Sequence, residues 1–158
     1  MASIEVDIEL KTSADKVWSS IKDYVVLFPK VFPDIYRSVE VLEGDGKSAG
    51  SLRKVTYHPT GEGMTQAAMT MFRVEFVDEE NKVICVKMVD GDVLKQYKKF
   101  VDKMAVRAKE GGEDGSVVTY TIEYEKISED TPDPLHIKDY SIDLFHKLDA
   151  YLQEEGKN

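Results

Sequence analysis

Tyrosines and phenylalanines are the residues of this 158-residue chain whose type and spacing point most clearly to a site. They recur in stretches of alternating apolar and polar residues, where every second side chain falls on the same face of a strand. A buried tyrosine combines an apolar ring with a hydroxyl that needs a hydrogen-bond partner. Several tyrosines on one inward face therefore predict an apolar pocket with a few polar groups. The set is Tyr57, Phe72, Tyr97, Tyr120, Tyr124 and Tyr140.

Three basic side chains are candidates for chemistry inside such a pocket. A desolvated lysine has a lowered pKa and can act as a base or nucleophile, and Lys99 lies in a strand-like stretch. His136 lies one helical turn before Tyr140 and shares its face, so it is a candidate general base. An inward cation at Arg53 favours the anchoring of a ligand carboxylate or hydroxyl. Strand alternation leaves the inward or outward orientation of Lys99 and Arg53 open.

Metal and phosphate chemistry find little support in the sequence. His58 and His146 have no partners at metal-ligand spacing, so no metal site is expected. The glycine-rich segment 44–50 invites a phosphate-binding interpretation, but such loops lead from a strand into a helix. Here Leu52 and Val55 follow in strand period, so a structural turn is favoured. No cofactor is expected.

The charge balance argues against a nucleic-acid partner. The chain has 21 Lys and Arg against 30 Asp and Glu, which gives a net charge of −9. Nucleic-acid binders usually present a basic face. Lysines at positions 95, 98, 99 and 103 could form a local patch, but such runs are usually the solvated face of a strand. No apolar run approaches the ~18 residues of a membrane span, so no membrane insertion is expected.

The compartment is inferred from two features. The first residues already alternate apolar and acidic side chains, so they offer no apolar stretch for a secretory signal. The single Cys85 cannot form an internal disulfide and is expected to be a small buried hydrophobe. Both features favour the cytoplasm, with the nucleus as a further location. The length suits one domain, residues 1–158.

The N-terminal elements come next. Residues 4–11 alternate as a strand with one buried face. Thr12 or Ser13 is expected to cap a short helix that runs to about Ile21. Pro29 and Pro33 bracket a second short helical or irregular piece.

Six consecutive strands and one long helix complete the pattern. The strands are expected to begin near Val39, Leu52, Phe72, Val83, Leu94 and Val117. Pro132-Asp133-Pro134 then predicts a helix start with Asp133 as N-cap, and apolar residues recur at helical spacing as far as Leu152. Hairpin-linked strands form an antiparallel sheet that must bury one face, and this helix is the only large apolar partner. A curved sheet has more concave area than one helix covers, which predicts an internal cavity.

Several segments resemble a known family over essentially the whole chain. Segments 27–31 (LFPKV), 38–46 (SVEVLEGDG) and 50–54 (GSLRK) resemble the birch-pollen-allergen fold. Within that superfamily of class-10 pathogenesis-related, START-like proteins, the major latex proteins are the most similar branch. The stretches that carry this resemblance are 91–100 (GDVLKQYKKF), 124–126 (YEK), 132–134 (PDP), 137–139 (IKD) and 148–152 (LDAYL). The loop from His58 to Ala68 departs most from the family's pattern.

The resemblance implies an α+β helix-grip fold. It consists of a seven-stranded, strongly curved antiparallel sheet wrapped around a long C-terminal helix. Two short helices lie between strands 1 and 2 and close one end of a hydrophobic cavity. Relatives bind hormones, flavonoids, sterols and other amphipathic plant metabolites, and a minority are enzymes of alkaloid assembly. A monomer is expected, with a dimer as the alternative.

Three functions follow as hypotheses. The first is a binding and carrier protein for hydrophobic metabolites, linked by family association to defence or stress. The second is an enzyme of alkaloid-type condensation or isomerisation in the same cavity, with Lys99 or His136 as catalytic candidates. The third is a hormone receptor that closes on its ligand and exposes a partner surface. The expected ligand contacts are Phe28, Phe32, Tyr36, Arg53, Tyr57, Phe72, Val74, Ile84, Val86, Met88, Tyr97, Tyr120, His136, Tyr140 and Leu144.

Overall fold

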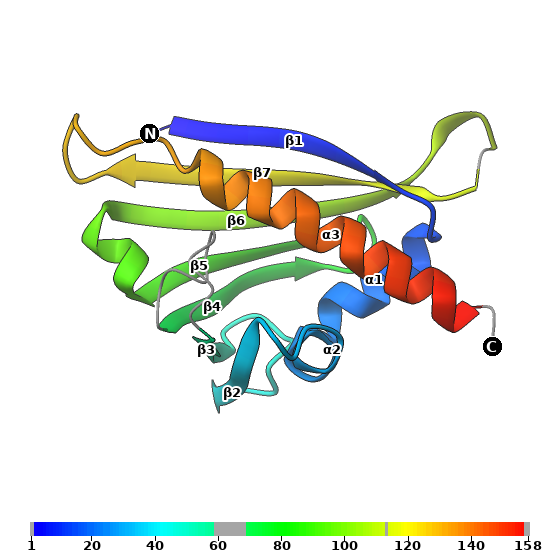
Figure 1. The fold of residues 1–158 in the computed structure, drawn as a ribbon, viewed down its shortest axis with the longest axis horizontal. Coiled ribbons are helices and arrows are strands. Elements are labelled where there is room, and N and C mark those ends of the chain that lie inside the picture. Colours follow the sequence, from blue (N-terminus) through cyan, green and yellow to red (C-terminus); the bar gives the residue numbers. More distant parts are fainter. Residues whose placement is uncertain (1, 59–68, 113, 157–158) are drawn as a thin grey trace.

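One sheet and one long helix dominate the computed structural model, which describes residues 2–58, 69–112 and 114–156 (Figure 1). The elements are β1 (Ala2–Leu10), α1 (Ala14–Lys22), α2 (Tyr24–Val31), β2 (Tyr36–Glu43), β3 (Leu52–Tyr57), β4 (Met69–Asp78), β5 (Val83–Gly91), β6 (Tyr97–Ala108), β7 (Ser116–Lys126) and α3 (Leu135–Gly156). Short 3₁₀ segments occupy Asp92–Lys95 and Glu110–Gly112. The predicted fold class is therefore confirmed.

The strands form a single antiparallel sheet in the order β1-β7-β6-β5-β4-β3-β2. Consecutive strands from β2 to β7 pair with each other, and β1 lies at the edge of the sheet, paired with β7. α3 runs along one face of this sheet, and α1 and α2 lie at one end of it (Figure 1). Register shifts in β2, β4 and β6 mark bulges, which bend strands and increase their twist.

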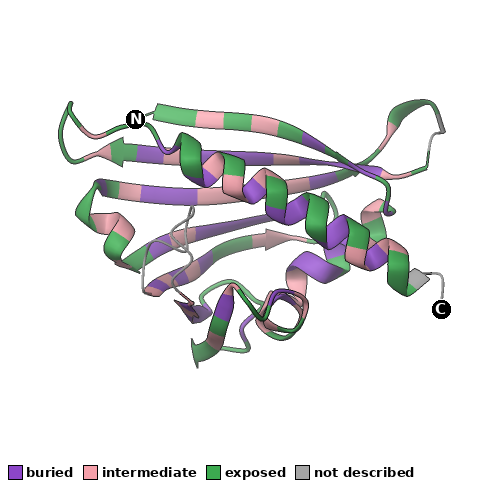
Figure 2. Ribbon diagram, in the orientation of Figure 1, coloured by how far each residue is buried: buried purple, intermediate pink, exposed green. Residues whose placement is uncertain are grey.

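Alternating burial explains why this sheet holds the helix (Figure 2). On β7, Val118 and Ile122 are fully buried, whereas Glu125 on the other face is exposed. α3 meets that face with a stripe that includes Ile137 and Leu148, which are at most 2% exposed. Each such side chain contributes roughly 1.5–3 kcal/mol of burial free energy, so this seam accounts for much of the stability.

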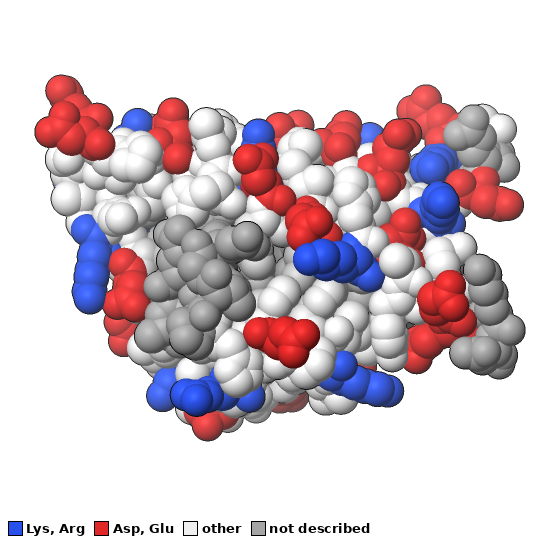
Figure 3. Space-filling view, in the orientation of Figure 1, with Lys and Arg blue, Asp and Glu red and all other residues white. Residues whose placement is uncertain are grey.

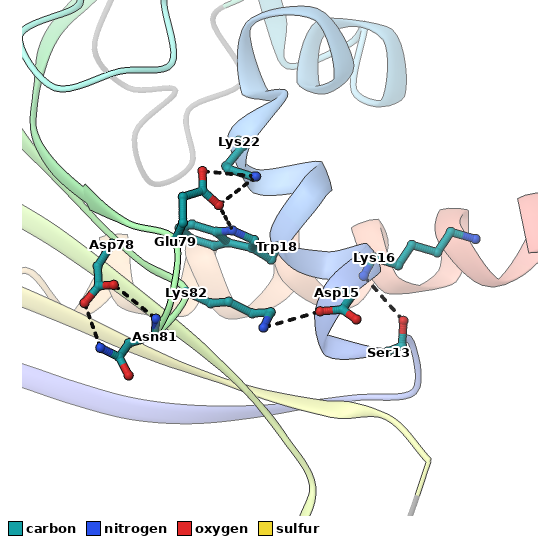
Figure 4. A network of polar contacts seen from close by, with 9 residues as sticks. All are labelled: Ser13, Asp15, Lys16, Trp18, Lys22, Asp78, Glu79, Asn81 and Lys82. Carbon is teal, nitrogen blue, oxygen red and sulfur yellow. Dashed lines mark hydrogen bonds and ion pairs between the residues drawn. The ribbon is translucent and has the colours of Figure 1, made fainter.

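α1 is held against the turn between β4 and β5 by polar contacts (Figure 4). Ser13 caps the helix by accepting a hydrogen bond from the Lys16 amide, which confirms one of the two predicted caps. Glu79 accepts a hydrogen bond from Trp18 Nε1 at 2.9 Å and pairs with Lys22 Nζ at 3.0 Å. These contacts hold α1 at one end of the sheet. Ile21 of α1 thereby reaches the interior.

A second polar contact fixes α3 relative to β1. The carboxylate of Asp149, which is 8% exposed, accepts hydrogen bonds from the Lys11 and Thr12 amides at 2.9 and 3.0 Å. The Thr12 hydroxyl donates to the same carboxylate at 2.6 Å. These contacts hold the C-terminal half of α3 against the segment that follows β1.

Three local predictions need correction. Alternation along residues 72–76 predicts that Phe76 shares the face of Phe72 and Val74, but a register shift between Val74 and Phe76 leaves Phe76 44% exposed. Leu94 was expected to begin a strand, yet it lies in a 3₁₀ turn before β6. The Asp133 carboxylate accepts a hydrogen bond from the Tyr124 hydroxyl at 2.7 Å instead of capping α3.

Charged side chains of both signs are interspersed on the face seen in Figure 3. Lys95 of the predicted basic run pairs with Asp92 at 3.0 Å. No helix in the described part of the chain has the length and apolar character that crossing a membrane requires. The expectation that nucleic acid is not a partner stays a prediction from composition.

Candidate functional site

A cavity of about 100 Å³ lies between α3, the inner face of the sheet and the two short helices. This volume has room for several water molecules or part of a compact organic ligand. It is below the ≈ 300–1,000 Å³ typical of sites for drug-sized ligands. The lining residues are Ile21, Tyr24, Phe28, Tyr36, Arg53, Tyr57, Phe72, Ile84, Val86, Asp102, Met104, Tyr120, Tyr140, Ser141, Leu144 and Phe145.

Most of the residues expected to contact a ligand lie on this wall. Those are Phe28, Tyr36, Arg53, Tyr57, Phe72, Ile84, Val86, Tyr120, Tyr140 and Leu144. Phe32, Val74, Met88 and Tyr97 are buried elsewhere in the core. Phe32 packs behind Phe28, with ring centroids 5.7 Å apart, and the Tyr97 hydroxyl donates to the Pro132 carbonyl at 2.6 Å.

The two candidate catalytic residues lie outside the cavity. His136 is exposed in the first turn of α3, so the expectation that it faces the ligand needs correction. Lys99 precedes the fully buried Phe100 and pairs in register with Glu125, so it shares the outer face of β6. Neither side chain can reach a molecule in the cavity without a rearrangement of the strand or helix that carries it.

Arg53 is the basic side chain that does point inward. It lies on β3 and is 4% exposed, and its Nε donates to the Gly46 carbonyl at 2.7 Å. Gly46 has a φ of +84°, where a Cβ would approach Val41 to 2.7 Å, so the turn requires glycine there. The glycine-rich loop connects two strands, as expected for a structural turn, and its backbone orients Arg53.

The guanidinium lies over the first of three neighbouring tyrosine rings. Its Cζ lies 5.2 Å from the centroid of the Tyr24 ring, which is a cation–π distance. The Tyr24 ring lies 5.8 Å from that of Tyr36, and Tyr36 lies 5.6 Å from Tyr57. Burial lowers the pKa of Arg53, but an arginine side chain remains protonated in proteins. The cavity therefore holds a permanent positive charge among tyrosines.

The tyrosine hydroxyls of the cavity stay neutral over the physiological pH range. Burial is the main cause that raises the pKa of Tyr24 to about 12 and that of Tyr36, Tyr57 and Tyr120 well above the ordinary value. The Tyr57 and Thr70 hydroxyls share a hydrogen bond of 3.1 Å. Neutral hydroxyls can donate as well as accept, so the wall offers hydrogen-bond donors to a ligand.

Asp102 contributes a carboxyl group to the same wall. It lies on β6 between Phe100 and Met104 and accepts a hydrogen bond from the Tyr120 hydroxyl at 3.1 Å. Burial raises its pKa to about 7, although the Tyr120 hydrogen bond lowers it. The residue is half-buried and lines the cavity. A carboxyl group with this pKa can gain or lose a proton near neutral pH.

Six lining residues were not predicted from the sequence, although some carried a usable signal. The missed residues are Ile21, Tyr24, Asp102, Met104, Ser141 and Phe145. Ser141 and Phe145 lie on the same helical stripe as Leu144, and Tyr24 lies one turn before Phe28. Across residues 2–58, 69–112 and 114–156, no three side chains of metal-binding type gather.

The comparison with known proteins decides the family. Residues 1–155 match the pathogenesis-related protein Bet v 1 family. The chain is also 37% identical over 152 residues to MLP-like protein 423 of Arabidopsis thaliana, which covers 96% of this chain and 94% of that protein. The chain belongs to the Bet v 1 family. Its resemblance to the major latex proteins is thereby confirmed.

Solved structures agree with this placement in the Bet v 1 family. The ginseng major latex-like protein 151 from Panax ginseng has a TM-score of 0.78 and 22% identity, covering 95% of this chain and 96% of that one. Norcoclaurine synthase from Thalictrum flavum, solved with dopamine and hydroxybenzaldehyde, has a TM-score of 0.72 and 21% identity. It covers 97% of this chain and 87% of that one. At these identities the likeness shows the fold alone.

Proposed function

We propose that this protein binds and carries a compact hydrophobic or amphipathic small molecule in the cavity under α3. The observation that carries the proposal is the wall itself, which is mostly apolar and aromatic with a few inward polar groups. Members of the Bet v 1 family bind small hydrophobic ligands. The volume of about 100 Å³ favours a single-ring or short-chain compound over a sterol.

Ligand capture from a lipophilic plant extract tests this proposal. The protein is incubated with the extract, separated from it, and measured by native mass spectrometry, and the bound compound is then identified after extraction. Val86 lines the cavity, so Val86→Phe should fill it and abolish retention. Val89 lies on the same strand but is 40% exposed, so Val89→Phe is the matched control and should retain the compound. Equal retention by wild type and Val86→Phe, or no retention at all, would contradict the proposal.

A second candidate function is proton transfer to a bound molecule, and Asp102 is the observation that favours it. A carboxyl group with a pKa of about 7 is suited to general acid–base chemistry near neutral pH. Lys99 and His136, the groups expected for condensation chemistry, lie outside the cavity, so Asp102 would have to act without them. The capture experiment separates the two functions. A carrier returns its compound unchanged, whereas an enzyme returns a new compound, and Asp102→Asn should stop that conversion.

A defence or stress role, a cytoplasmic or nuclear location and a monomeric state stay predictions. The receptor hypothesis needs ligand-dependent binding to another protein. A pull-down with and without the captured compound tests it directly.

A further inference from the structure

Two buried side-chain atoms in the described part of the chain lack a hydrogen-bond partner, and both belong to the cavity wall. They are Arg53 Nη2 and Tyr140 Oη. Buried polar groups are nearly always hydrogen-bonded, because leaving one unpaired costs its full desolvation free energy. Two such atoms on one cavity therefore point to an acceptor that the described protein groups do not supply.

Arg53 needs more than a neutral acceptor. Its Nε is satisfied by the Gly46 carbonyl, and its guanidinium faces the Tyr24 ring. The Asp45 carboxylate is near enough to raise the pKa of Arg53, but no carboxylate among the described residues forms an ion pair with it. A buried cation without an anion is strongly disfavoured, and guanidinium groups match carboxylates in shape and charge. The missing partner at Nη2 is therefore expected to be negatively charged.

Tyr140 lines the same cavity from α3. Its hydroxyl lies near that of Tyr36 and influences its pKa, but the two do not meet hydrogen-bond geometry. Arg53 and Tyr140 both lie near Tyr24: Arg53 faces its ring, and the nearby Tyr24 hydroxyl contributes to the raised pKa of Tyr140. Burial, foremost, raises the pKa of Tyr140, so its hydroxyl keeps its proton and is free to donate.

Asp102 does not fill this role. It lies on β6, three strands from Arg53 on β3, which is roughly 14 Å along the sheet at ~4.8 Å per strand. Its one hydrogen bond comes from Tyr120, and burial favours its neutral form. The end of the cavity near Arg53 thus carries positive charge and donors, and the other end carries a weakly acidic group.

We propose that the ligand is a compact lipophilic carboxylic acid whose carboxylate accepts hydrogen bonds from Arg53 Nη2 and Tyr140 Oη. The apolar body of the acid lies against Phe28, Phe72 and Leu144, which line the same cavity. This inference rests on the proposed binding function and deepens it by naming the chemical class of the ligand. It excludes cationic amines, because Arg53 would repel them.

Three probes with one carbon skeleton test the inference: 3-phenylpropanoate, 3-phenylpropanamide and 3-phenylpropylamine. Their affinities are measured by NMR titration or calorimetry at pH 7. A hydrogen bond to a charged group favours the carboxylate over the amide by about ten- to a hundredfold, and the amine should bind weakest. Arg53→Met should abolish the preference for the carboxylate while amide binding changes by less than about threefold. Tyr140→Phe should weaken the carboxylate by about three- to tenfold.

The matched control is Arg73→Met. Arg73 lies on neighbouring β4, donates to Glu43 at 2.7 Å and to the Gly50 carbonyl at 2.8 Å, and does not line the cavity. It should keep the full preference for the carboxylate. If Arg53→Met has no cooperative melting transition, Arg53→Gln replaces it, since glutamine keeps amide donors without the charge.

The outcomes distinguish the two proposals. Equal affinity of wild type for the carboxylate and the amide would overturn the inference, because water would then satisfy Arg53, while cavity binding would stand. Binding of all three probes that survives Val86→Phe would place them outside the cavity, and the inference would fail. Absence of any probe binding, together with no captured compound from the extract, would contradict the binding function itself.

Discussion

The concave face of the sheet has two parts that bury different chemistry. The packed part is defined by Ile8, Leu10, Val118, Leu148 and Leu152, which are aliphatic and at most 3% exposed. The cavity part is defined by Arg53, Tyr57, Asp102, Tyr120 and Tyr140, which bring a cation, an acid and hydroxyl groups into the same interior. Both parts meet α3, and both belong to the interior of one sheet.

The difference teaches how this fold divides stability from binding. Close-packed aliphatic side chains contribute dispersion and burial free energy, and any truncation leaves a void. Unpaired polar groups in the cavity part lower stability, and a ligand can recover that loss when it pairs with them. Substitutions in the packed part should therefore destabilise, whereas removal of selected polar groups in the cavity part should stabilise.

The largest expected effect is Leu148→Ala in the packed part. Leu148 is 0% exposed, so truncation removes burial and leaves a cavity, and the free energy of unfolding should fall by about 2–5 kcal/mol. Chemical denaturation monitored by circular dichroism measures this change. Leu135→Ala, on the same helix at a position 51% exposed, is the control and should stay within about 0.5 kcal/mol. A loss below about 1 kcal/mol for Leu148→Ala would show that this part is not closely packed.

Asp102→Asn should have the next largest effect, in the opposite direction. The pKa of Asp102 is about 7 in the folded protein against an ordinary value of 3.8, so folding favours the protonated acid. That contribution is fully present below pH 3.8 and is lost as pH rises toward 7, and above pH 7 the buried carboxylate destabilises the fold. Asparagine avoids this loss, and at pH 8 it should raise the free energy of unfolding by about 2–4 kcal/mol.

The pH dependence provides the control for Asp102→Asn. Tyr120 donates a hydrogen bond to Asp102, and the charge of Asp102 also acts on Tyr24, Tyr57 and Cys85. All four groups stay neutral at pH 8 because burial raises their pKa values. Arg53 keeps its charge throughout. The difference between variant and wild type should therefore grow from about pH 4 to pH 8. A difference that is independent of pH would mean that Asp102 is not a buried titrating group.

The placement of Asp102 also shows where sequence reasoning reached its limit. The sheet and helix periods were long and regular, so the element order was predictable. In β6, however, Tyr97 and Phe100 are both fully buried. They are three positions apart, so in a regular strand they would lie on opposite faces. The register shift between Tyr97 and Lys99 makes this possible. If inward and outward side chains are counted alternately from Tyr97, Lys99 points inward. If they are counted from Phe100, Asp102 points inward.

The bulge in β6 therefore explains both why Asp102 was missed and why the orientation of Lys99 stayed open. Such a bulge adds a residue without an obvious sequence signal, so alternation alone could not choose between the two phases. Phe76 illustrates the same limit on β4. Arg53 was left open for a different reason. Burying a cation is costly, and only the turn around Gly46 shows which backbone group supports it.

A pair of tyrosine variants sharpens the comparison inside the cavity part. Tyr140→Phe removes an unpaired hydroxyl, so it should stabilise the fold by about 1 kcal/mol in the absence of ligand. Tyr57→Phe removes a hydroxyl that is bonded to Thr70, so it should destabilise by about the same amount. Both variants lose one oxygen, and each controls for the other. If chemical denaturation shows that both variants lower the free energy of unfolding, Tyr140 has a hydrogen-bond partner such as ordered water.

The smallest effects are expected at Lys99 and His136, which lie outside both parts. Surface substitutions usually change stability by less than about 0.5 kcal/mol, so Lys99→Ala and His136→Ala should melt like wild type. Retention of a captured compound should also stay within about twofold, since neither side chain lines the cavity. Asp102→Asn and Arg53→Met, measured beside them, should change binding by more. A loss of binding or turnover in Lys99→Ala alone would show that β6 shifts its register when a ligand enters. In that case the cavity under α3 would not be the one that binds the ligand.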